Sequence, residues 1–194
     1  MNQGLAEHRK LSPQAIVSAA LDVADSEGLD AVSLSRVARE LDCHVTSLYS
    51  HVESLDDLRL RLAVAVQAEL AQQLWEAALG RSGSEALREI AAVYRRFGAE
   101  HAARARLLFL MTASSDEEFI DGGRVLAEPI RATLAGLGLD ERRARYAHRA
   151  FSAALRGFTL AESQGAYGSE ADETFDEVVA LFLSALESEA WPTS

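Results

Sequence analysis

A short run of small, hydroxyl-bearing and aromatic side chains between residues 44 and 51 has the chemistry of a surface that reads DNA. Hydroxyl, phenol and imidazole groups hydrogen-bond to phosphates or base edges, and valine or threonine methyls contact thymine methyls in a major groove. Flanking serines and basic side chains can hold phosphates. We therefore predict a DNA-binding set that comprises Arg9, Lys10, Ser33, Ser35, Arg36, His44, Val45, Thr46, Ser47, Tyr49, Ser50 and His51.

The elements around this run predict a helix-turn-helix. Val37, Ala38 and Leu41 share one face of a helix over 33–41, and Leu48 is the inward residue of a second helix over 45–51. Ala38 is small, as required where two helices cross closely. Asp42 falls in the turn, where a left-handed backbone is needed and aspartate is among the few tolerated residues.

Helical periodicity dominates the whole chain, and we predict an all-α fold of about nine helices. Serine caps, as in Ser12-Pro13 and Ser54-x-x-Asp57, and glycines mark their starts and ends. We expect a break or kink near Gly122, Gly123 and Pro129. The expected helices span 12–27, 33–41, 45–51, 54–79, 84–101, 104–113, 116–136, 140–166 and 170–190.

Composition excludes several classes of protein. The chain of 194 residues is 48% apolar and 25% charged, which is typical of a globular protein. One cysteine, Cys43, excludes a disulfide framework and a Cys-x-x-Cys motif, and neither it nor His44 has further ligands nearby for a metal. We find no catalytic signature, so we expect neither an enzyme nor a cofactor. No secretory or membrane-spanning segment is evident, and we expect a cytoplasmic protein without membrane contact.

Several motifs in the first 58 residues resemble the tetracycline-repressor (TetR) family of bacterial regulators. They include Val37-Ala38-x-x-Leu41, Leu48-Tyr49-x-His51-Val52 and Leu55-x-x-Leu58. The resemblance implies a DNA-binding domain over 1–53 and an effector-binding and dimerisation domain over 54–194. It further implies a homodimer that binds a palindromic operator, most often as a repressor, and is released by a small, mostly apolar effector.

This sequence departs from the family pattern at several points. Asp42 replaces a glycine, His44 replaces a serine or threonine cap, and Leu55 replaces a lysine that usually contacts phosphate. Residues 1–52 also carry a net charge of −3, from four basic and seven acidic side chains, which predicts few phosphate contacts. These departures keep open an alternative: an α-helical ligand-binding or interaction module of the same fold that has lost DNA binding.

The last two expected helices carry apolar stripes, but the periodicity does not show which surface these stripes pack against. They could pack within one chain or against a second copy, and the resemblance favours the copy. The expected dimer interface comprises Phe158, Phe175, Val178, Val179, Phe182, Leu183 and Leu186. Residues 151–157 resemble the Trp-x-x-x-x-His-Gly stretch of one C-terminal subgroup, with Phe151 and Arg156 departing from it.

A second set of residues in the middle helices could line an effector pocket. It combines aromatic side chains with a few polar groups, which suits a mostly apolar ligand. For each residue taken alone, ordinary hydrophobic core is the competing interpretation. The set comprises Tyr94, Phe97, His101, Phe109, Met111, Phe119, Phe151 and Arg156.

Overall fold

The computed structural model describes residues 11–188, and this range forms nine α-helices, three short 3-10 helices and no strand. The predicted all-α class is confirmed, and each expected helix is present with ends shifted by a few residues. The helices are α1 (Pro13–Glu27), α2 (Leu34–Glu40), α3 (Val45–Leu48), α4 (Leu55–Ala78), α5 (Gly83–Glu100), α6 (Ala102–Leu110), α7 (Glu117–Ala135), α8 (Glu141–Ser163) and α9 (Ala171–Glu187). None of the described helices is long and apolar enough to span a membrane.

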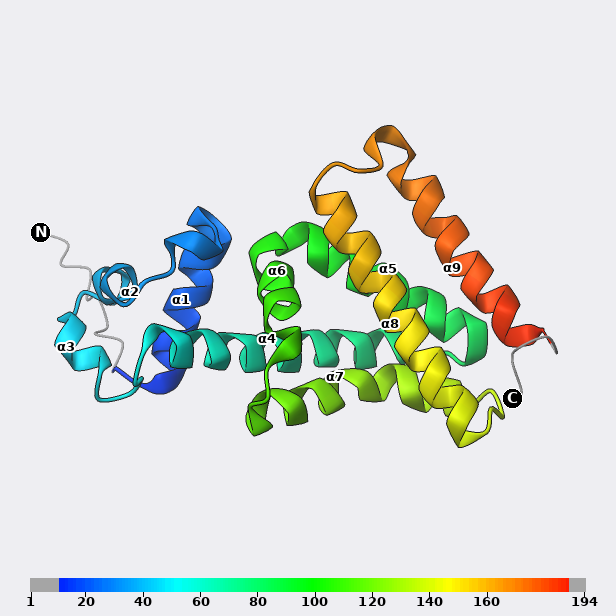
Figure 1. Cartoon of the computed structure of the whole chain (residues 1–194), viewed down its shortest axis with the longest axis horizontal. Coiled ribbons are helices and arrows are strands. Elements are labelled where there is room, and N and C mark those ends of the chain that lie inside the picture. The colour runs from blue at the N-terminus through cyan, green and yellow to red at the C-terminus, as the bar shows by residue number, and fades with distance from the viewer. Residues whose placement is uncertain (1–10, 189–194) are drawn as a thin grey trace, which may run out of the picture.

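The first three helices form a small unit at one end of α4, which we call the head (residues 11–53) (Figure 1). Serine caps begin its first two helices, because Ser12 accepts from the backbone N–H of Ala15 and Ser33 accepts from that of Arg36. Buried Ile16, Val37 and Leu48 join the three helices into one core. The short helices are thus stabilised by packing on one another.

The turn between α2 and α3 has the predicted left-handed residue. Asp42 has φ 49°, the only positive φ of a non-glycine residue between 11 and 188. The backbone N–H of Cys43 donates to the Ala38 carbonyl at 2.9 Å, which closes the turn over the small side chain of Ala38. The helix-turn-helix geometry is therefore present, although α3 ends at Leu48 rather than at 51 and continues as a turn.

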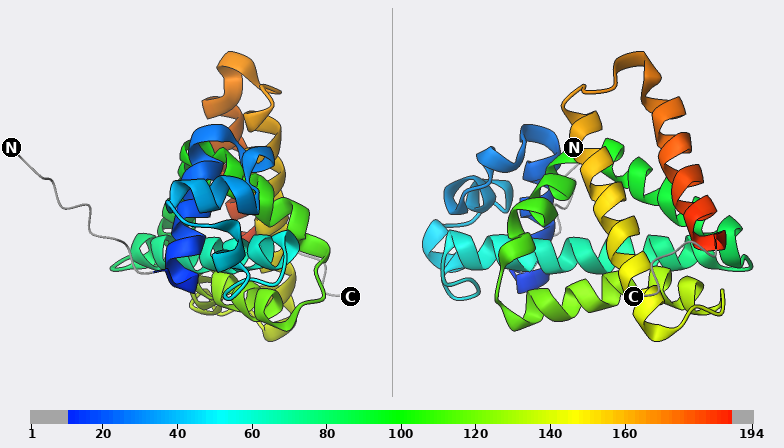
Figure 2. Two further views of the ribbon diagram at one scale, coloured as in Figure 1. Left: turned by 90° about the vertical axis from the view of Figure 1, so that its left-hand side faces the viewer. Right: turned by 45° about the vertical axis from the view of Figure 1, so that its right-hand side comes forward.

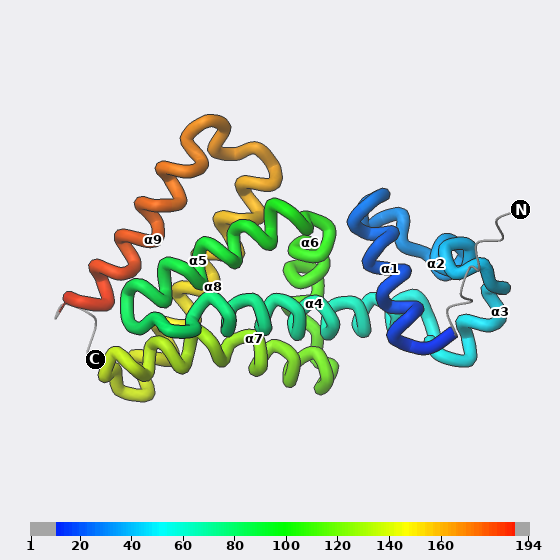
Figure 3. Tube along the Cα trace, turned by 180° about the vertical axis from the view of Figure 1, so that it is seen from behind, coloured from blue at the N-terminus to red at the C-terminus, as the bar shows by residue number. Residues whose placement is uncertain are grey.

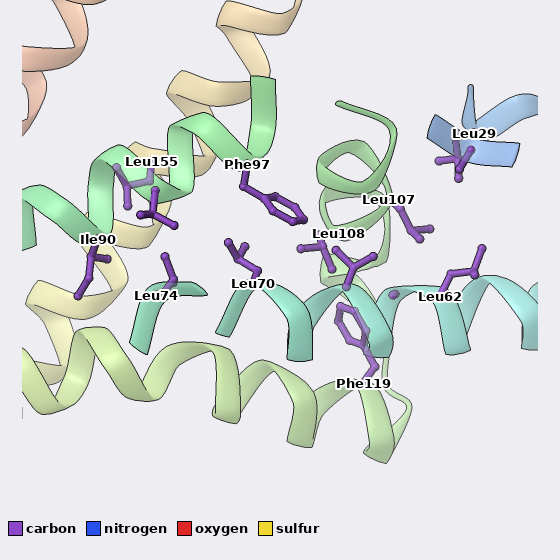
Figure 4. Close-up of a cluster of buried hydrophobic side chains, with 14 of the residues drawn as sticks. Leu29, Leu62, Leu70, Leu74, Ile90, Phe97, Leu107, Leu108, Phe119 and Leu155 are labelled. Carbon is purple, nitrogen blue, oxygen red and sulfur yellow. The ribbon is translucent and has the colours of Figure 1, made fainter. Parts of the chain in front are cut away.

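The long helix α4 connects the head to the remaining helices, which we call the body (residues 54–188). Figures 1 and 3 show α7 running alongside α4 and α6 crossing it, with α5 on a further side. Helix α4 packs chiefly on α7 and α5. Its buried residues Leu62, Val66, Leu70 and Leu74 recur at helical spacing and form the centre of the body core (Figure 4).

Helix α7 continues without interruption through both glycines and Pro129, so of the expected break or kink the break is absent. The glycines serve close packing instead. A Cβ at Gly122 would lie 2.2 Å from Oε1 of Gln67, a buried residue of α4. A side chain at 122 would therefore displace the amide end of Gln67 from its present position.

Arg95 of α5 binds residues of both α8 and α9. Its guanidinium binds Glu162 of α8 at 2.5 Å and Asp172 of α9 at 2.6 Å, and it lies 4.8 Å from the ring centre of Phe175. Figure 2 shows α8 and α9 as a pair on the outer side of the body, joined by the connection that includes the 3-10 helix Gly168–Glu170. Charge pairing and cation–π contact together fix this pair of helices on α5.

Candidate DNA-binding surface and ligand cavity

The segment predicted to read DNA lies on the surface of the head. Leu48 is fully buried, whereas Tyr49 next to it is 57% exposed and has no core role. His44, Thr46 and Ser50 are also exposed, and Val45, Ser47 and His51 are half-buried. The Ser50 hydroxyl donates to the Ser47 carbonyl at 2.7 Å, so its proton is already engaged. One side of α3 and the following turn therefore presents polar groups to solvent.

The start of α3 lacks a side-chain cap. His44 occupies the N-cap position with an extended backbone, but its side chain accepts no hydrogen bond from the first turn. This agrees with the weaker cap that the replacement of serine or threonine predicts. The side chain of His44 therefore accepts no hydrogen bond from the backbone N–H groups at the start of α3.

The basic residues expected to hold phosphates are less available than the sequence suggests. Arg36 binds Glu27 at 2.6 Å and Glu40 at 2.8 Å, and these partners raise its pKa while the pKa of Glu27 is lowered. Its charge is therefore compensated inside the head. Ser33 is engaged as the cap of α2, and Ser35 is exposed. Arg9 and Lys10 lie outside the described residues.

Sequence reasoning missed Arg39, which has the exposure that Arg36 lacks. It lies in the last turn of α2, is exposed, and makes no ion pair with another described residue. Its exposure, in the last turn of the first helix of the helix-turn-helix, makes it the better phosphate candidate of the two. One sequence signal separates the two arginines, because Glu40 stands four residues after Arg36 on the same helix, whereas Glu27, the other partner of Arg36, lies nine residues earlier on another helix.

A cavity of about 540 Å³ lies between the head, α5, α6 and α8. Its wall includes Leu29 from the head, Leu108 and Phe109 from α6, and Leu160 from α8. Polar groups enter from Tyr94, Arg156 and Thr159. The Thr159 hydroxyl is buried and has no hydrogen-bond partner. This volume and lining suit a small, largely apolar molecule.

A second cavity of about 210 Å³ lies between α4, α7 and α8 and shares Tyr94, Leu108 and Arg156 with the first. Gln67 and His148 line it, and the buried Oε1 of Gln67 has no partner. Burial raises the pKa of Tyr94 to about 12, so its phenol stays protonated at neutral pH. Burial, together with the charges of Arg131, Arg156 and Arg149, lowers the pKa of His148.

The eight residues expected around an effector separate into two groups. Tyr94 and Arg156 line both cavities, Phe109 lines the larger, and Phe119 lines the smaller. The other four line neither of these two cavities. Phe151 is buried and stacks on Phe182 at 4.5 Å, whereas Phe97 is buried against His101. The remaining residue is Met111, which packs half-buried on the core.

Gln67, His148 and Thr159 are cavity residues that the sequence analysis did not select. A signal for Gln67 existed, because it stands among apolar residues at helical spacing, with Ala63 before it and Leu70 after it. A polar residue on a buried stripe needs a partner or a ligand. His148 carries the same signal, with Ala144 four residues before it and Phe151 three after, whereas Thr159 is followed at these spacings by Glu162 and Ser163.

Ion pairs link the cavity helix α6 directly to the head. Arg104 binds Asp25 of α1 at 2.6 Å and Glu69 of α4 at 2.5 Å, and Arg106 binds Asp30 at 3.0 Å. The head residues Gly28 and Leu29 are themselves part of the wall of the larger cavity. A molecule in this cavity would therefore touch the head and the body at once.

Most of the residues expected at a dimer interface pack inside the protomer. Phe158, Phe175, Val179, Leu183 and Leu186 are buried within the single chain, and Val178 and Phe182 are half-buried. The apolar stripe of α9 thus serves intrachain packing at Phe175, Val179, Leu183 and Leu186, and Phe158 of α8 is buried in the same chain. The outer faces of α8 and α9 still expose apolar side chains, with Leu181 at 69% and Tyr146 at 45% exposure.

Comparison with known proteins agrees with this architecture. The family model of the tetracyclin repressor-like C-terminal domain matches residues 87–182. An HTH-type transcriptional regulator of Mycobacterium tuberculosis is 32% identical over 187 residues, which cover 95% of this chain and 86% of that protein. The chain belongs to the TetR family of transcriptional regulators. It is therefore a transcriptional regulator and not an enzyme.

Two solved TetR-family structures share the fold. ActR of Streptomyces coelicolor, in complex with (S)-DNPA, has a TM-score of 0.71 at 24% identity over 93% of this chain and 98% of that one. A TetR of Acinetobacter baumannii, in complex with minocycline, has a TM-score of 0.71 at 22% identity over 92% of this chain and 97% of that one. At these identities the likeness concerns the fold alone.

Proposed function

We propose that this TetR-family regulator is a homodimeric repressor that binds a palindromic operator through α3 and is released by a small effector in the body. The observation that carries the proposal is the position of the larger cavity. Its wall contains Gly28 and Leu29 of the head together with α6 and α8, so a ligand contacts the DNA-binding unit as well as the body. The proposed division is a DNA-binding domain over 1–53 and an effector-binding and dimerisation domain over 54–194.

In the proposed complex, Val45, Thr46, Tyr49 and His51 read base edges in the major groove, and Arg39 and Ser35 hold phosphates. The exposure of Thr46 and Tyr49 over a buried Leu48 supports this assignment. Two heads of a symmetric dimer would read half-sites one helical turn apart, about 34–36 Å. The operator is then a palindrome because the dimer has a two-fold axis.

The proposed dimer forms through the outer faces of α8 and α9. Leu181 is exposed on α9, and Tyr146, Ala150 and Ala153 are exposed on α8. Helix α8 presents Arg145 and Arg149, whereas α9 presents Asp176 and Glu177, so the two helices carry opposite charge. An isologous contact of α8 with the partner's α9 would pair these charges around an apolar centre. The half-buried Val178 and Phe182 remain candidates at its edge.

The proposed release follows from the junction of α6 with the head. An effector that occupies the larger cavity presses on α6 and on Leu29, and Arg104 and Arg106 transmit the displacement to Asp25 and Asp30. The head then moves relative to α4, and the spacing of the two heads no longer matches the operator. Such release requires that the effector binds the DNA-free form more tightly.

Selection of duplexes from a random pool by the purified full chain tests the proposal. We expect a palindromic consensus, and we expect Tyr49→Ala to lose it while exposed Gln72→Ala on α4 retains it. A functional screen for molecules that release the selected duplex tests effector control. The compensated Arg36 favours the alternative of a fold that has lost DNA binding, and recovery of no consensus at low salt would establish that alternative.

A further inference from the structure

The walls of the two cavities contain no carboxylate, although the chain has 30 Asp and Glu residues against 19 Lys and Arg. Their charged or ionisable lining residues are Arg106, Arg156, His148 and Tyr94. Arg106 is paired with Asp30 at 3.0 Å. These two cavities are therefore neutral to positive, unlike a third cavity beside α1 and α4 that Asp22 and Glu118 help to line, and a ligand with a negative group would meet no repulsion from the walls of the two.

Arg156 lies where the two cavities meet and has no carboxylate partner among residues 11–188. Its only hydrogen bond there runs from Nε to the Ser152 carbonyl of its own helix, at 3.2 Å. That bond holds the side chain along α8 and leaves the two Nη groups free to donate. A guanidinium with two free donors is suited to bind the two oxygens of a carboxylate.

Tyr94 lies beside Arg156 in both walls and supplies a further donor. Its hydroxyl makes no hydrogen bond to another described residue, and the charge of Arg156 acts on it. Because its pKa is raised to about 12, the phenol remains a donor throughout the neutral range. Arg156 and Tyr94 thus supply donors to both cavities. Two buried atoms without partners also belong to the lining residues, Thr159 Oγ1 in the larger cavity and Gln67 Oε1 in the smaller.

Apart from Arg106, Ser163 and Gln164, the rest of the larger cavity is lined by apolar residues and glycines. Leu29, Leu108, Phe109, Leu110 and Leu160 line it together with three alanines of α6. A volume of about 540 Å³ admits an organic molecule of moderate size, since ligand sites commonly measure ~300–1,000 Å³. An inorganic anion would leave this apolar surface unfilled. The occupant must combine a negative end with an apolar body.

We infer that the effector is an amphiphilic organic monoanion whose carboxylate binds Arg156 and Tyr94 and whose apolar body fills the larger cavity. This inference rests on the proposed ligand-responsive function and specifies its ligand class. A hydroxyl on the body would additionally find the unpartnered Thr159 Oγ1 in the larger cavity. The same site disfavours amines, because an ammonium group would lie beside the like charge of Arg156 and would find no carboxylate in the walls of the two cavities to pair with.

The inference is tested by calorimetry on the full chain with three probes of one chain length: decanoate, decan-1-ol and decylamine. We expect decanoate to bind at least ~10-fold more tightly than decan-1-ol, since a hydrogen-bonded charged group contributes about that factor or more. Arg156→Met should abolish this preference while leaving decan-1-ol affinity within ~3-fold. Arg149→Met is the matched control, because Arg149 is an exposed arginine of the same helix that lines neither cavity.

A second pair of probes covers aromatic ligands. The dye 1-anilinonaphthalene-8-sulfonate differs from N-phenyl-1-naphthylamine by its sulfonate. We expect Arg156→Met to weaken the binding of the sulfonated dye and to leave the binding of the neutral amine unchanged. The inference is overturned if neither anionic probe binds more tightly than its neutral match, or if the preference survives Arg156→Met with normal unfolding.

Release of the selected duplex, measured separately, distinguishes the two hypotheses. An Arg156-dependent anion preference without DNA release supports the anion site and rejects effector control. Release by neutral ligands that Arg156→Met leaves unchanged supports effector control and rejects the anion site.

Discussion

The close approach of α5 to α8 at Gly98 offers a sharp test of the packing around the larger cavity. A Cβ built on Gly98 would lie 1.9 Å from Cγ2 of Thr159, whereas it would lie 3.4 Å from Cβ and 3.7 Å from Oγ1 of the same side chain. Carbon atoms in contact are normally separated by ~3.5–4.0 Å. The methyl of Thr159 is thus the one atom that forbids a side chain at 98.

We expect Gly98→Ala to destabilise the protein even though alanine is the better helix former. The overlap requires Thr159 or the α5–α8 spacing to shift, and overpacking of a core costs ~1–3 kcal/mol. The depth of the overlap places the cost at the upper end of that range. Replacement of glycine by alanine inside a helix returns ~1 kcal/mol. The net loss in the free energy of unfolding is therefore about 2 kcal/mol.

Thr159→Ser removes the obstructing methyl and should reverse the effect. In that background Gly98→Ala meets only ordinary contacts, and we expect it to be neutral or to stabilise by up to ~1 kcal/mol. Urea unfolding of the four proteins, followed by circular dichroism at one protomer concentration, gives a coupling energy, for which we expect ~2–3 kcal/mol. An equal effect of Gly98→Ala in both backgrounds would refute this account of the α5–α8 contact.

Three further predictions concern the head, the dimer and the cavity. Tyr49→Ala should lower the affinity for the selected operator ~10–100-fold. It should change the free energy of unfolding by less than ~0.5 kcal/mol, because the ring is exposed. An unfolded variant would instead assign Tyr49 to the core. Leu181→Asp should raise the dimer dissociation constant at least ~10-fold in sedimentation, and an unchanged profile would reject the α8–α9 interface. His148→Gln should lose less stability than the parent between pH 7 and 5.5. Because the pKa of His148 is lowered in the folded protein, acid protonates this residue first in the unfolded chain and thereby favours unfolding of the parent. Equal losses of stability in the parent and in His148→Gln would contradict this reasoning.

The elements of the fold could be predicted because their signals are local. Ser12, Ser33 and Ser54 cap the helices that they were expected to begin, and Asp42 adopts the left-handed turn. The prediction failed at α7, where Gly122 was interpreted as a helix breaker. The reason for that glycine is Gln67, 55 positions earlier on α4, and a single sequence does not state such a contact.

Functional residues were harder to predict than the helices because availability depends on partners from other elements. The spacing of Arg36 and Glu40 on one helix is visible in the sequence, but only the packing of α1 against α2 shows that Glu27 engages Arg36 as well. The apolar residues of α9 recur at a spacing that would suit a dimer interface. In the structure they face α5 and α8, and most of them form part of the core within one chain. Periodicity identifies a buried face but not the element that buries it.

The acidic residues of the head and the unpaired arginine of the body have a connected physical meaning. In the head, Glu27 and Glu40 neutralise Arg36, while Asp25 and Asp30 bind arginines of α6. Much of the excess negative charge of the head is therefore used to order the head and to attach it to the cavity helix. Arg106 lines the larger cavity together with Arg156, so an anion bound at Arg156 would share that cavity with an arginine that attaches α6 to the head. The charge balance that makes this head look unsuited to DNA is, in this interpretation, the means by which an anionic effector would control it.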